Sequence, residues 1–297
     1  MSLNDEIAIL GSGVIGQATG KGFVEKGYRV VFIDIDRKVV EKLRDDGYDS
    51  VHVSELDQRS PDLFFITVQV PTKRKGPHVK ELKRSIEDIG LYIKKANKYV
   101  LVAVRSTVPP LTTKDFVTPL LEKTSGKKAG EDFGVCSNPE YMRERFGKED
   151  FLNSKVIIIG SEDRVAAEKL GVFYEDFPSN VHYFKTAEAE MHKYVHNLYN
   201  ACKISFFNEQ RVVCEVMDLD ADRIFKAVTE SAEAFWNLEY GIRKMGPFEG
   251  SCLPKDTKGF LRWGRHSLKK RLFLTEGVIK VNSRLKRRSG LLSYLNL

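Results

Sequence analysis

The chain contains 297 residues, of which 42% are hydrophobic and 30% are charged, a composition that excludes wholesale disorder. This length corresponds to about two domains, and no apolar run approaches the roughly 20 residues needed to cross a bilayer, so we expect no membrane partner. The four cysteines have no paired metal or disulfide spacing, so we expect a cytoplasmic protein without a zinc site. The net charge is +7, and much of it lies in one segment near the carboxyl end.

Strand-like and helix-like segments alternate through the first 185 residues. Short runs rich in Val, Ile and Phe predict buried parallel strands, at residues 6–10, 29–34, 62–70, 99–104, 133–136 and 156–159. Helical periodicity fills most of the intervals, at residues 14–26, 37–45 and 79–96. The alternation predicts an α/β fold of Rossmann type, with a doubly wound parallel sheet, over residues 1–186.

The pattern changes after residue 186. Residues 186–217 lack Pro and Gly and are apolar at helical spacing, which predicts one long helix. Helical segments at 221–228 and 273–287 flank a loop-rich stretch that extends to Pro254. We therefore expect a mostly α-helical domain over residues 187–297. The long helix has more apolar surface than one domain can cover, so we expect a homodimer that buries the remainder.

The first glycine cluster, Gly11-Ser12-Gly13-Val14-Ile15-Gly16, follows a predicted strand and opens a predicted helix. This context favours a dinucleotide fingerprint over a simple packing turn, because the glycines let the backbone and the helix N-terminus approach a pyrophosphate. Asp34 ends the second strand, where its carboxylate can accept hydrogen bonds from ribose hydroxyls and would repel a 2′-phosphate. We expect NAD, although Arg37 nearby could accommodate that phosphate.

A lysine and an amide share one face of the predicted long helix. Lys193 and Asn197 are four residues apart, so both can approach one atom and stabilise an oxyanion, although a surface pair is the simpler interpretation. His192 and His196 have the same spacing. Without a third ligand or the glutamate of a zinc-protease motif, we expect no metal there.

The cysteines fall into two groups. Cys136 ends a predicted strand, and Cys202 and Cys214 lie in the predicted long helix, so we expect these three to pack in the core. Cys252 lies in residues 250–256 (GSCLPKD), a segment bounded by Gly and Pro that predicts a loop. A partly exposed thiol beside a lysine can act as a nucleophile, with a structural cysteine as the alternative.

The basic segment spans residues 262–288, which hold ten Lys or Arg against one acid, Glu276. Its cations are not interleaved with stacking aromatic residues, so we expect no nucleic-acid partner. A solvated helix face is the simplest interpretation. The alternative is a phosphate-binding role.

Together these motifs resemble the UDP-glucose/GDP-mannose dehydrogenase family. The resemblance runs from Ile7 to about Asn282 through five ordered motifs, at residues 11–16, 105–109 (RSTVP), 138–144 (NPEYMRE), 187–209 and 250–256. It implies an NAD-dependent oxidation of the C6 alcohol of a nucleotide sugar to the carboxylate, with two hydrides transferred in turn.

The resemblance also implies roles for individual side chains. Cys252 would trap the aldehyde as a thiohemiacetal that becomes a thioester, while Asp256 and Lys193 would assist deprotonation of the alcohol. Lys193 and Asn197 would hold the oxyanion. Glu144 would serve thioester hydrolysis, and Glu140 and Thr107 would position water and the reacting group. The expected cofactor residues are Gly11, Gly13, Val14, Ile15, Gly16, Asp34 and Arg37, together with Thr107 and Glu144.

Three features depart from the family pattern. The family has a further α/β domain that binds the nucleotide, whereas this sequence stops at Leu297. Glu249 stands in a stretch that is glycine-rich in the family, and Arg145 replaces a glycine after Arg-Glu. We hypothesise that the basic segment, including Arg287 and Arg288, binds the substrate pyrophosphate in place of that domain; a partner chain could equally supply the site.

Two other functions remain open from the sequence. A two-domain β-hydroxyacid dehydrogenase would use Lys193 and need no cysteine. A catalytically degenerate NAD-binding module would bind the cofactor without turnover. The number of NADH released per substrate distinguishes the three functions. A nucleotide-sugar dehydrogenase releases two, a β-hydroxyacid dehydrogenase releases one, and a degenerate module releases none.

Overall fold

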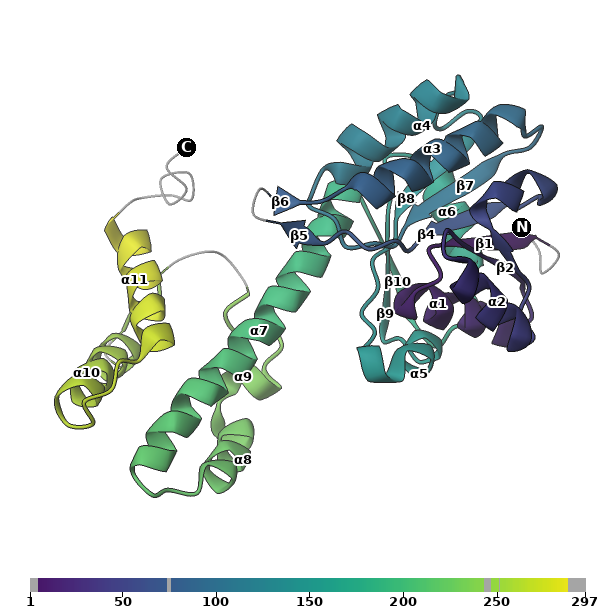
Figure 1. The fold of residues 1–297 in the computed structure, drawn as a ribbon. Helices are drawn as coiled ribbons and strands as arrows, with labels where there is room; N and C mark the ends of the chain where they lie inside the picture. Colours follow the sequence, from purple (N-terminus) through teal and green to yellow (C-terminus); the bar gives the residue numbers. More distant parts are fainter. Residues whose placement is uncertain (1–4, 74–75, 243–246, 251, 288–297) are drawn as a thin grey trace. The chain divides into compact units, whose positions relative to one another are not determined.

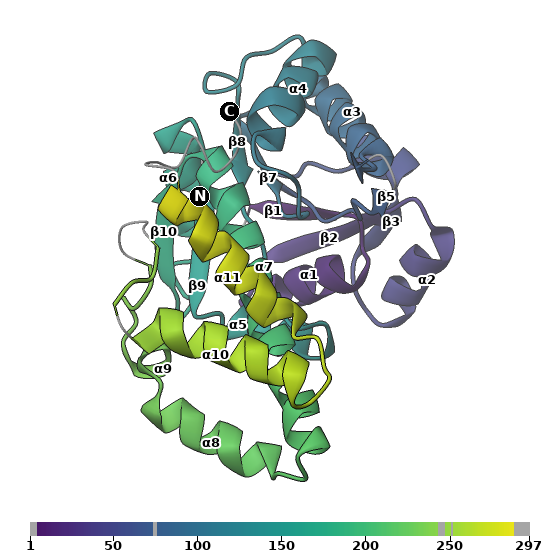
Figure 2. The same cartoon turned by 90° about the vertical axis from the view of Figure 1, so that its left-hand side faces the viewer.

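The computed structural model describes residues 5–73, 76–242, 247–250 and 252–287 (Figures 1 and 2). The chain divides into two compact units, one ending at His196 and the other beginning at Asn197. A domain boundary between residues 186 and 187 stays a prediction.

An eight-stranded sheet forms the centre of the first unit, with the order β10-β9-β8-β7-β4-β1-β2-β3. From β3 to β8 every neighbouring pair is parallel, and β9 meets β8 in antiparallel fashion through Ser137 and Gly160. The strands are β1 (Glu6–Leu10), β2 (Arg29–Asp34), β3 (Ser50–His52), β4 (Leu63–Ile66), β7 (Val100–Val104), β8 (Phe133–Ser137), β9 (Val156–Gly160) and β10 (Asn180–Phe184). A separate hairpin pairs β5 (Thr72–Lys73) with β6 (Gly76–Pro77).

Helices cover both faces of this sheet, which explains the continuous apolar strands. On β1, Ala8 and Leu10 enter the core beneath α3 (Lys80–Lys95) and α4 (Thr118–Ser125). Ile7 and Ile9 enter the core on the opposite face of the sheet. That core is closed by α1 (Val14–Glu25), α2 (Arg37–Asp45), α5 (Gly147–Leu152) and α6 (Arg164–Val172). The Rossmann-type fold predicted from the sequence is confirmed.

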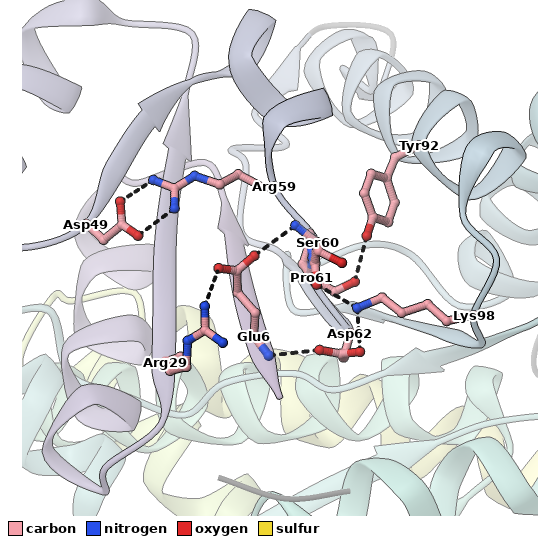
Figure 3. A network of polar contacts seen from close by, with 9 residues as sticks. All are labelled: Glu6, Arg29, Asp49, Arg59, Ser60, Pro61, Asp62, Tyr92 and Lys98. Atoms are coloured by element: carbon pink, nitrogen blue, oxygen red, sulfur yellow. Dashed lines mark hydrogen bonds and ion pairs between the residues drawn. The ribbon is translucent and has the colours of Figure 1, made fainter. Parts of the chain in front are cut away.

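A polar network closes the sheet at the amino-terminal ends of its strands (Figure 3). Glu6, only 7% exposed, accepts a hydrogen bond from Ser60 N at 3.1 Å. Its own backbone N–H donates to Asp62 Oδ2 at 2.9 Å, and Lys98 Nζ donates to Asp62 Oδ1 at 2.5 Å. Because these charged groups pair with one another, the network joins neighbouring strands at this edge of the sheet.

The second unit is helical. The long helix α7 (Thr186–Val216) is confirmed and continues from the first unit into the second. It is followed by α8 (Ala221–Ser231), α9 (Glu233–Trp236), α10 (Cys252–His266) and α11 (Phe273–Arg287). Phe207 of α7 contacts Phe225 of α8, with ring centroids 4.9 Å apart. None of the helices in the described part of the chain is long and apolar enough to cross a membrane.

Two local predictions are wrong. The segment around Cys252 is not a loop, because α10 begins at Cys252 and includes Pro254. Proline is tolerated there because first-turn N–H groups have no partner within the helix. Cys202 is exposed rather than buried, since this face of α7 is not covered by the chain's own described helices, whereas Cys136 and Cys214 are buried as expected.

Candidate active site

The glycine-rich turn connects β1 to α1 in the conformation that its glycines permit. Gly11 has φ +97°, a left-handed conformation that favours glycine. A Cβ on Gly16 would lie 2.2 Å from Gly11 O, so only glycine lets the helix approach the turn this closely. Gly11 and Gly16 therefore have the steric roles expected of them in the turn and in close packing of the helix.

Open space lies in front of the α1 N-terminus. A Cβ added at Gly13 would meet no described atom within 4 Å. No side chain of the described residues caps this helix, and its first turn carries no acidic residue. Helix N-terminal N–H groups favour an anion. The turn therefore fits the pyrophosphate of a dinucleotide.

Asp34 lies beside this turn, at the end of β2, in a pocket of about 290 Å³. Its Oδ2 accepts a hydrogen bond from Ser12 N at 2.6 Å, and its Oδ1 accepts one from Asp36 N at 2.9 Å. These bonds hold the carboxylate at the pocket wall, where it can still accept from ribose hydroxyls. Arg37 is exposed in the first turn of α2 and is not among the residues that line the pocket.

Replacing Asp34 by alanine should weaken NAD binding about 10- to 100-fold, the expected loss for hydrogen bonds to a charged acceptor. The preference for NAD over NADP should fall as well, because the charge that repels a 2′-phosphate is gone. Calorimetric titration with both cofactors measures the two effects. The control is Asp45→Asn, which neutralises an exposed carboxylate on α2. An unchanged NAD affinity would contradict the assignment.

A second pocket, of about 320 Å³, adjoins the first along Thr67, Val68 and Gln69. Thr107 and Glu140 line it. The two pockets lie where the strand order reverses between β1 and β4, the usual ligand position in a doubly wound sheet. The two pockets together form one trough, which Gly11 and Gly13 of the glycine-rich turn line together with Thr107 and Glu140.

Hydrogen bonds join the loops that form this trough. Thr67 Oγ1 donates to Gly11 O at 2.7 Å, which links the end of β4 to the glycine-rich turn. Ser106 Oγ donates to Val68 O at 2.6 Å, which links the loop of Thr107 to the same strand end. The position of Thr107 therefore depends on both neighbouring loops.

Lys193 and Glu140 form a buried ion pair. The Lys193 Nζ lies 3.0 Å from Glu140 Oε1, and the two side chains are 7% and 11% exposed. Lys193 also donates to the backbone oxygen of Glu140, while Met142 N donates to Glu140 Oε2 at 2.7 Å. Buried charges are costly unless paired. A cation held beside Glu140, which lines the trough, can polarise a hydroxyl or stabilise an oxyanion.

Tyr141 explains the two histidines of α7. His192 Nδ1 lies 2.6 Å from the Tyr141 hydroxyl, and the His196 ring lies 4.8 Å from the Tyr141 ring, centroid to centroid. Burial lowers the pKa of His192, and the positive charges of His196 and His182 lower it further. Within the described residues, no group of three or more His, Cys, Asp or Glu could hold a metal ion.

Arg105 and Asn138 support the site, although neither was expected from the sequence to have a role of its own. Arg105, 5% exposed, donates from Nη1 to Asn138 Oδ1 at 2.6 Å and from Nε to Thr19 Oγ1 at 2.9 Å. Tyr174 donates to the same Asn138 oxygen at 2.7 Å, and burial raises its pKa to about 12. Polar residues directly after buried strands were the available signal. This network fixes the loops that carry Thr107 and Glu140.

The remaining expected catalytic residues are placed as follows. Glu144 begins a short 3-10 helix, and its side chain lies outside the described part of the structure. Asn197 is exposed one turn after Lys193 on α7. Cys252 is the exposed first residue of α10, and Asp256 in the same helix pairs with Lys255 at 2.8 Å. The second unit contains Asn197, Cys252 and Asp256.

Acidic residues neutralise part of the basic segment. Glu276 pairs with Arg265, Arg271 and Lys280, and the hydrogen bonds from Lys280 and Arg271 lower the pKa of Glu276 to about 2. Lys286 pairs with Glu249 at 3.6 Å. The side chain of Arg287 and all of Arg288 lie outside the described residues. The described cations are thus less available to a pyrophosphate than the local charge suggests.

Comparison with known proteins agrees with this geometry. Residues 50–178 match the NAD binding domain of the UDP-glucose/GDP-mannose dehydrogenase family, and residues 187–284 match its central domain. Residues 7–62 also match the TrkA-N domain. The UDP-glucose 6-dehydrogenase AglM of Haloferax volcanii is 30% identical over 88% of this chain and 65% of its own length. The chain thus spans about two thirds of this relative.

Solved structures show the same relationship. The GDP-mannose dehydrogenase of Pseudomonas aeruginosa matches with a TM-score of 0.88 and 26% identity, covering 95% of this chain and 69% of that one. A UDP-glucose dehydrogenase from Pyrobaculum islandicum matches with a TM-score of 0.71 and 30% identity, covering 96% and 69%.

Proposed function

We propose, because the chain belongs to the UDP-glucose/GDP-mannose dehydrogenase family, that it oxidises the C6 alcohol of a nucleotide sugar to the carboxylate. NAD is its cofactor, and it accepts the hydride of each of the two oxidations. The observation that carries this proposal is the buried ion pair between Lys193 and Glu140, because Glu140 lines the trough together with Thr107.

In the first oxidation the sugar alcohol loses its proton and a hydride and becomes an aldehyde. We assign Lys193 and Asn197 to stabilise the developing alkoxide, with Asp256 assisting removal of the proton. A cation held in a buried pair needs little reorganisation as negative charge develops on the substrate oxygen. Thr107 and Glu140 would orient the reacting group.

In the second oxidation the Cys252 thiolate adds to the aldehyde and forms a thiohemiacetal. Loss of a hydride from that carbon gives a thioester, which water hydrolyses to the carboxylate and the regenerated thiol, with Glu144 and Glu140 positioning the water. The location of Cys252 at the α10 N-terminus supports this role, because the helix dipole there stabilises negative charge. A cytoplasmic location fits, since a reducing compartment keeps the thiol reduced.

We further propose that residues 1–186 bind NAD and that residues 187–297 mediate homodimerisation. Apolar side chains on α7 support the dimer, since Leu198, Tyr199 and Ile204 are 59%, 61% and 62% exposed. Sedimentation at micromolar concentration should show a dimer, and a monomer alone would contradict it.

The function is tested by incubating the protein with NAD and UDP-glucose, UDP-galactose, GDP-mannose or a UDP-N-acetyl sugar. We expect two NADH for each molecule of the preferred sugar, measured by absorbance and by mass spectrometry of the product. One NADH per substrate would favour a β-hydroxyacid dehydrogenase. NAD binding without turnover would indicate a degenerate module.

A further inference from the structure

We infer that Asn282 is a positioning residue for Cys252. It acts through the backbone of residues 248–250, which lie shortly before this cysteine in the chain. The inference rests on the proposed role of Cys252 as the nucleophile. It concerns residues that all belong to the second unit, and it assigns Asn282 no contact with the substrate.

The Asn282 carboxamide satisfies both backbone groups of one residue. Its Oδ1 accepts a hydrogen bond from Phe248 N at 2.7 Å, and its Nδ2 donates to Phe248 O at 3.1 Å. Asn282 is 8% exposed, although it lies on a helix whose other described side chains are half-buried or exposed. Asparagine is a weak helix former. Among the described residues, the side-chain hydrogen bonds of this buried mid-helix asparagine go to Phe248, so we take its role to be holding the backbone there.

A second contact lies one helical turn later. Lys286 Nζ approaches Glu249 Oε1 at 3.6 Å, so residues 248 and 249 are both held by the same face of α11. Both side chains of the pair are well exposed, which makes this the weaker hold. Glu249 is the residue that departs from the glycine-rich family pattern. Lys286 neutralises the charge that this departure introduces.

The position of α11 is itself fixed from α7. Glu209 accepts hydrogen bonds from Leu274 N at 2.6 Å and from Thr275 N at 3.1 Å, and the Thr275 hydroxyl donates to it at 2.8 Å. A carboxylate at this position satisfies free N–H groups of the first turn of α11 and complements its dipole. One chain of hydrogen bonds therefore runs from α7 through α11 to the segment that leads into Cys252.

This arrangement has a specific consequence for the reaction. An aldehyde released before the thiolate attacks is lost, so capture requires the sulfur to be in place beforehand. Loosening the segment before Cys252 should impair capture of the aldehyde more than its formation. A residue that only stabilised the fold would slow both oxidations together.

The experiment compares Asn282→Ala with the neighbouring control Ser283→Ala in the full chain. Hydrogen exchange measured by mass spectrometry should show Phe248 exchanging about fivefold to tenfold faster in Asn282→Ala alone, as expected for one lost hydrogen bond. With a carbonyl trap present, NADH released per sugar should fall from two toward one. The initial rate of the first oxidation should stay within about threefold.

The charge pair supplies a second arm that does not depend on a buried substitution. Glu249→Lys and Lys286→Glu should each lower the NADH yield per sugar slightly, and the double exchange should restore it. If Asn282→Ala leaves hydrogen exchange at Phe248 unchanged and still yields two NADH per sugar, the inference is overturned while the function stays intact. If that variant does not fold, equal NADH yields in the single and double charge variants would overturn the inference. A wild-type chain without turnover would contradict the function instead, and the exchange measurement would still test the contact.

Discussion

Cys252→Ser should leave the first oxidation intact and stop the second, so that each sugar yields one NADH and an aldehyde. The serine hydroxyl has nearly the same size, and it keeps a polar atom at the α10 N-terminus. However, it is far less ionised than a thiol and adds poorly to a carbonyl without a base. Formation of the carboxylate should therefore fall about a thousandfold or more, as is typical when a covalent nucleophile is removed.

Stopped-flow absorbance separates the two hydride transfers, and a hydroxylamine trap followed by mass spectrometry identifies the released aldehyde. Cys202→Ser is the matched control, because Cys202 is also exposed but lies on α7. It should retain two NADH per sugar. Carboxylate formation at the wild-type rate in Cys252→Ser would exclude the covalent mechanism.

The central strands were predictable because each is covered on both faces. That burial makes β1 and β2 continuous apolar runs, and both were predicted with their observed bounds. The short edge strand β3 (SVH) and the exposed edge strand β10 (NVHYF) were not predicted. An edge strand needs no apolar run, since one side of its ladder has no neighbour.

The helix that begins at Cys252 was missed for a different reason. Pro254 and the preceding glycine are usually signs of a loop, yet proline is compatible with the first turn of a helix. Only the long amphipathic segment after it, residues 257–266, could have indicated that a helix follows. Position relative to the helix start decides the meaning of such a residue, and the start is the least certain feature of a sequence pattern.

The parts of the candidate site also differ in how far they could be predicted from the sequence. The glycine-rich turn is local, so the glycine spacing and Asp34 predict a cofactor site there directly. The Lys193–Glu140 pair joins residues 53 positions apart, and the Arg105–Asn138 bond joins residues 33 apart. Helical spacing showed that Lys193 and Asn197 share a face, but it could not show which carboxylate neutralises the lysine.

Lys193→Met should combine a large loss of activity with a loss of stability. Methionine preserves the length of the apolar stem and removes the cation that we assign to the substrate oxygen. We expect kcat to fall about 10²- to 10³-fold, comparable to removal of one oxyanion donor. Breaking the buried pair also leaves the Glu140 carboxylate with little exposure to solvent, at a cost of about 3–5 kcal/mol in unfolding free energy.

A second substitution separates these two effects. In the double variant Lys193→Met with Glu140→Gln, no charge remains unpaired at this position, and the amide can still accept the hydrogen bond from Met142 N. Denaturant unfolding should therefore show stability recovering toward the wild-type value, while kcat stays as low as in Lys193→Met or lower. Recovery of kcat together with stability would show that Lys193 acts only by neutralising Glu140. Low activity in a protein of restored stability would instead mean that the loss of activity in Lys193→Met does not come from the unpaired charge of Glu140 or from a weakened fold.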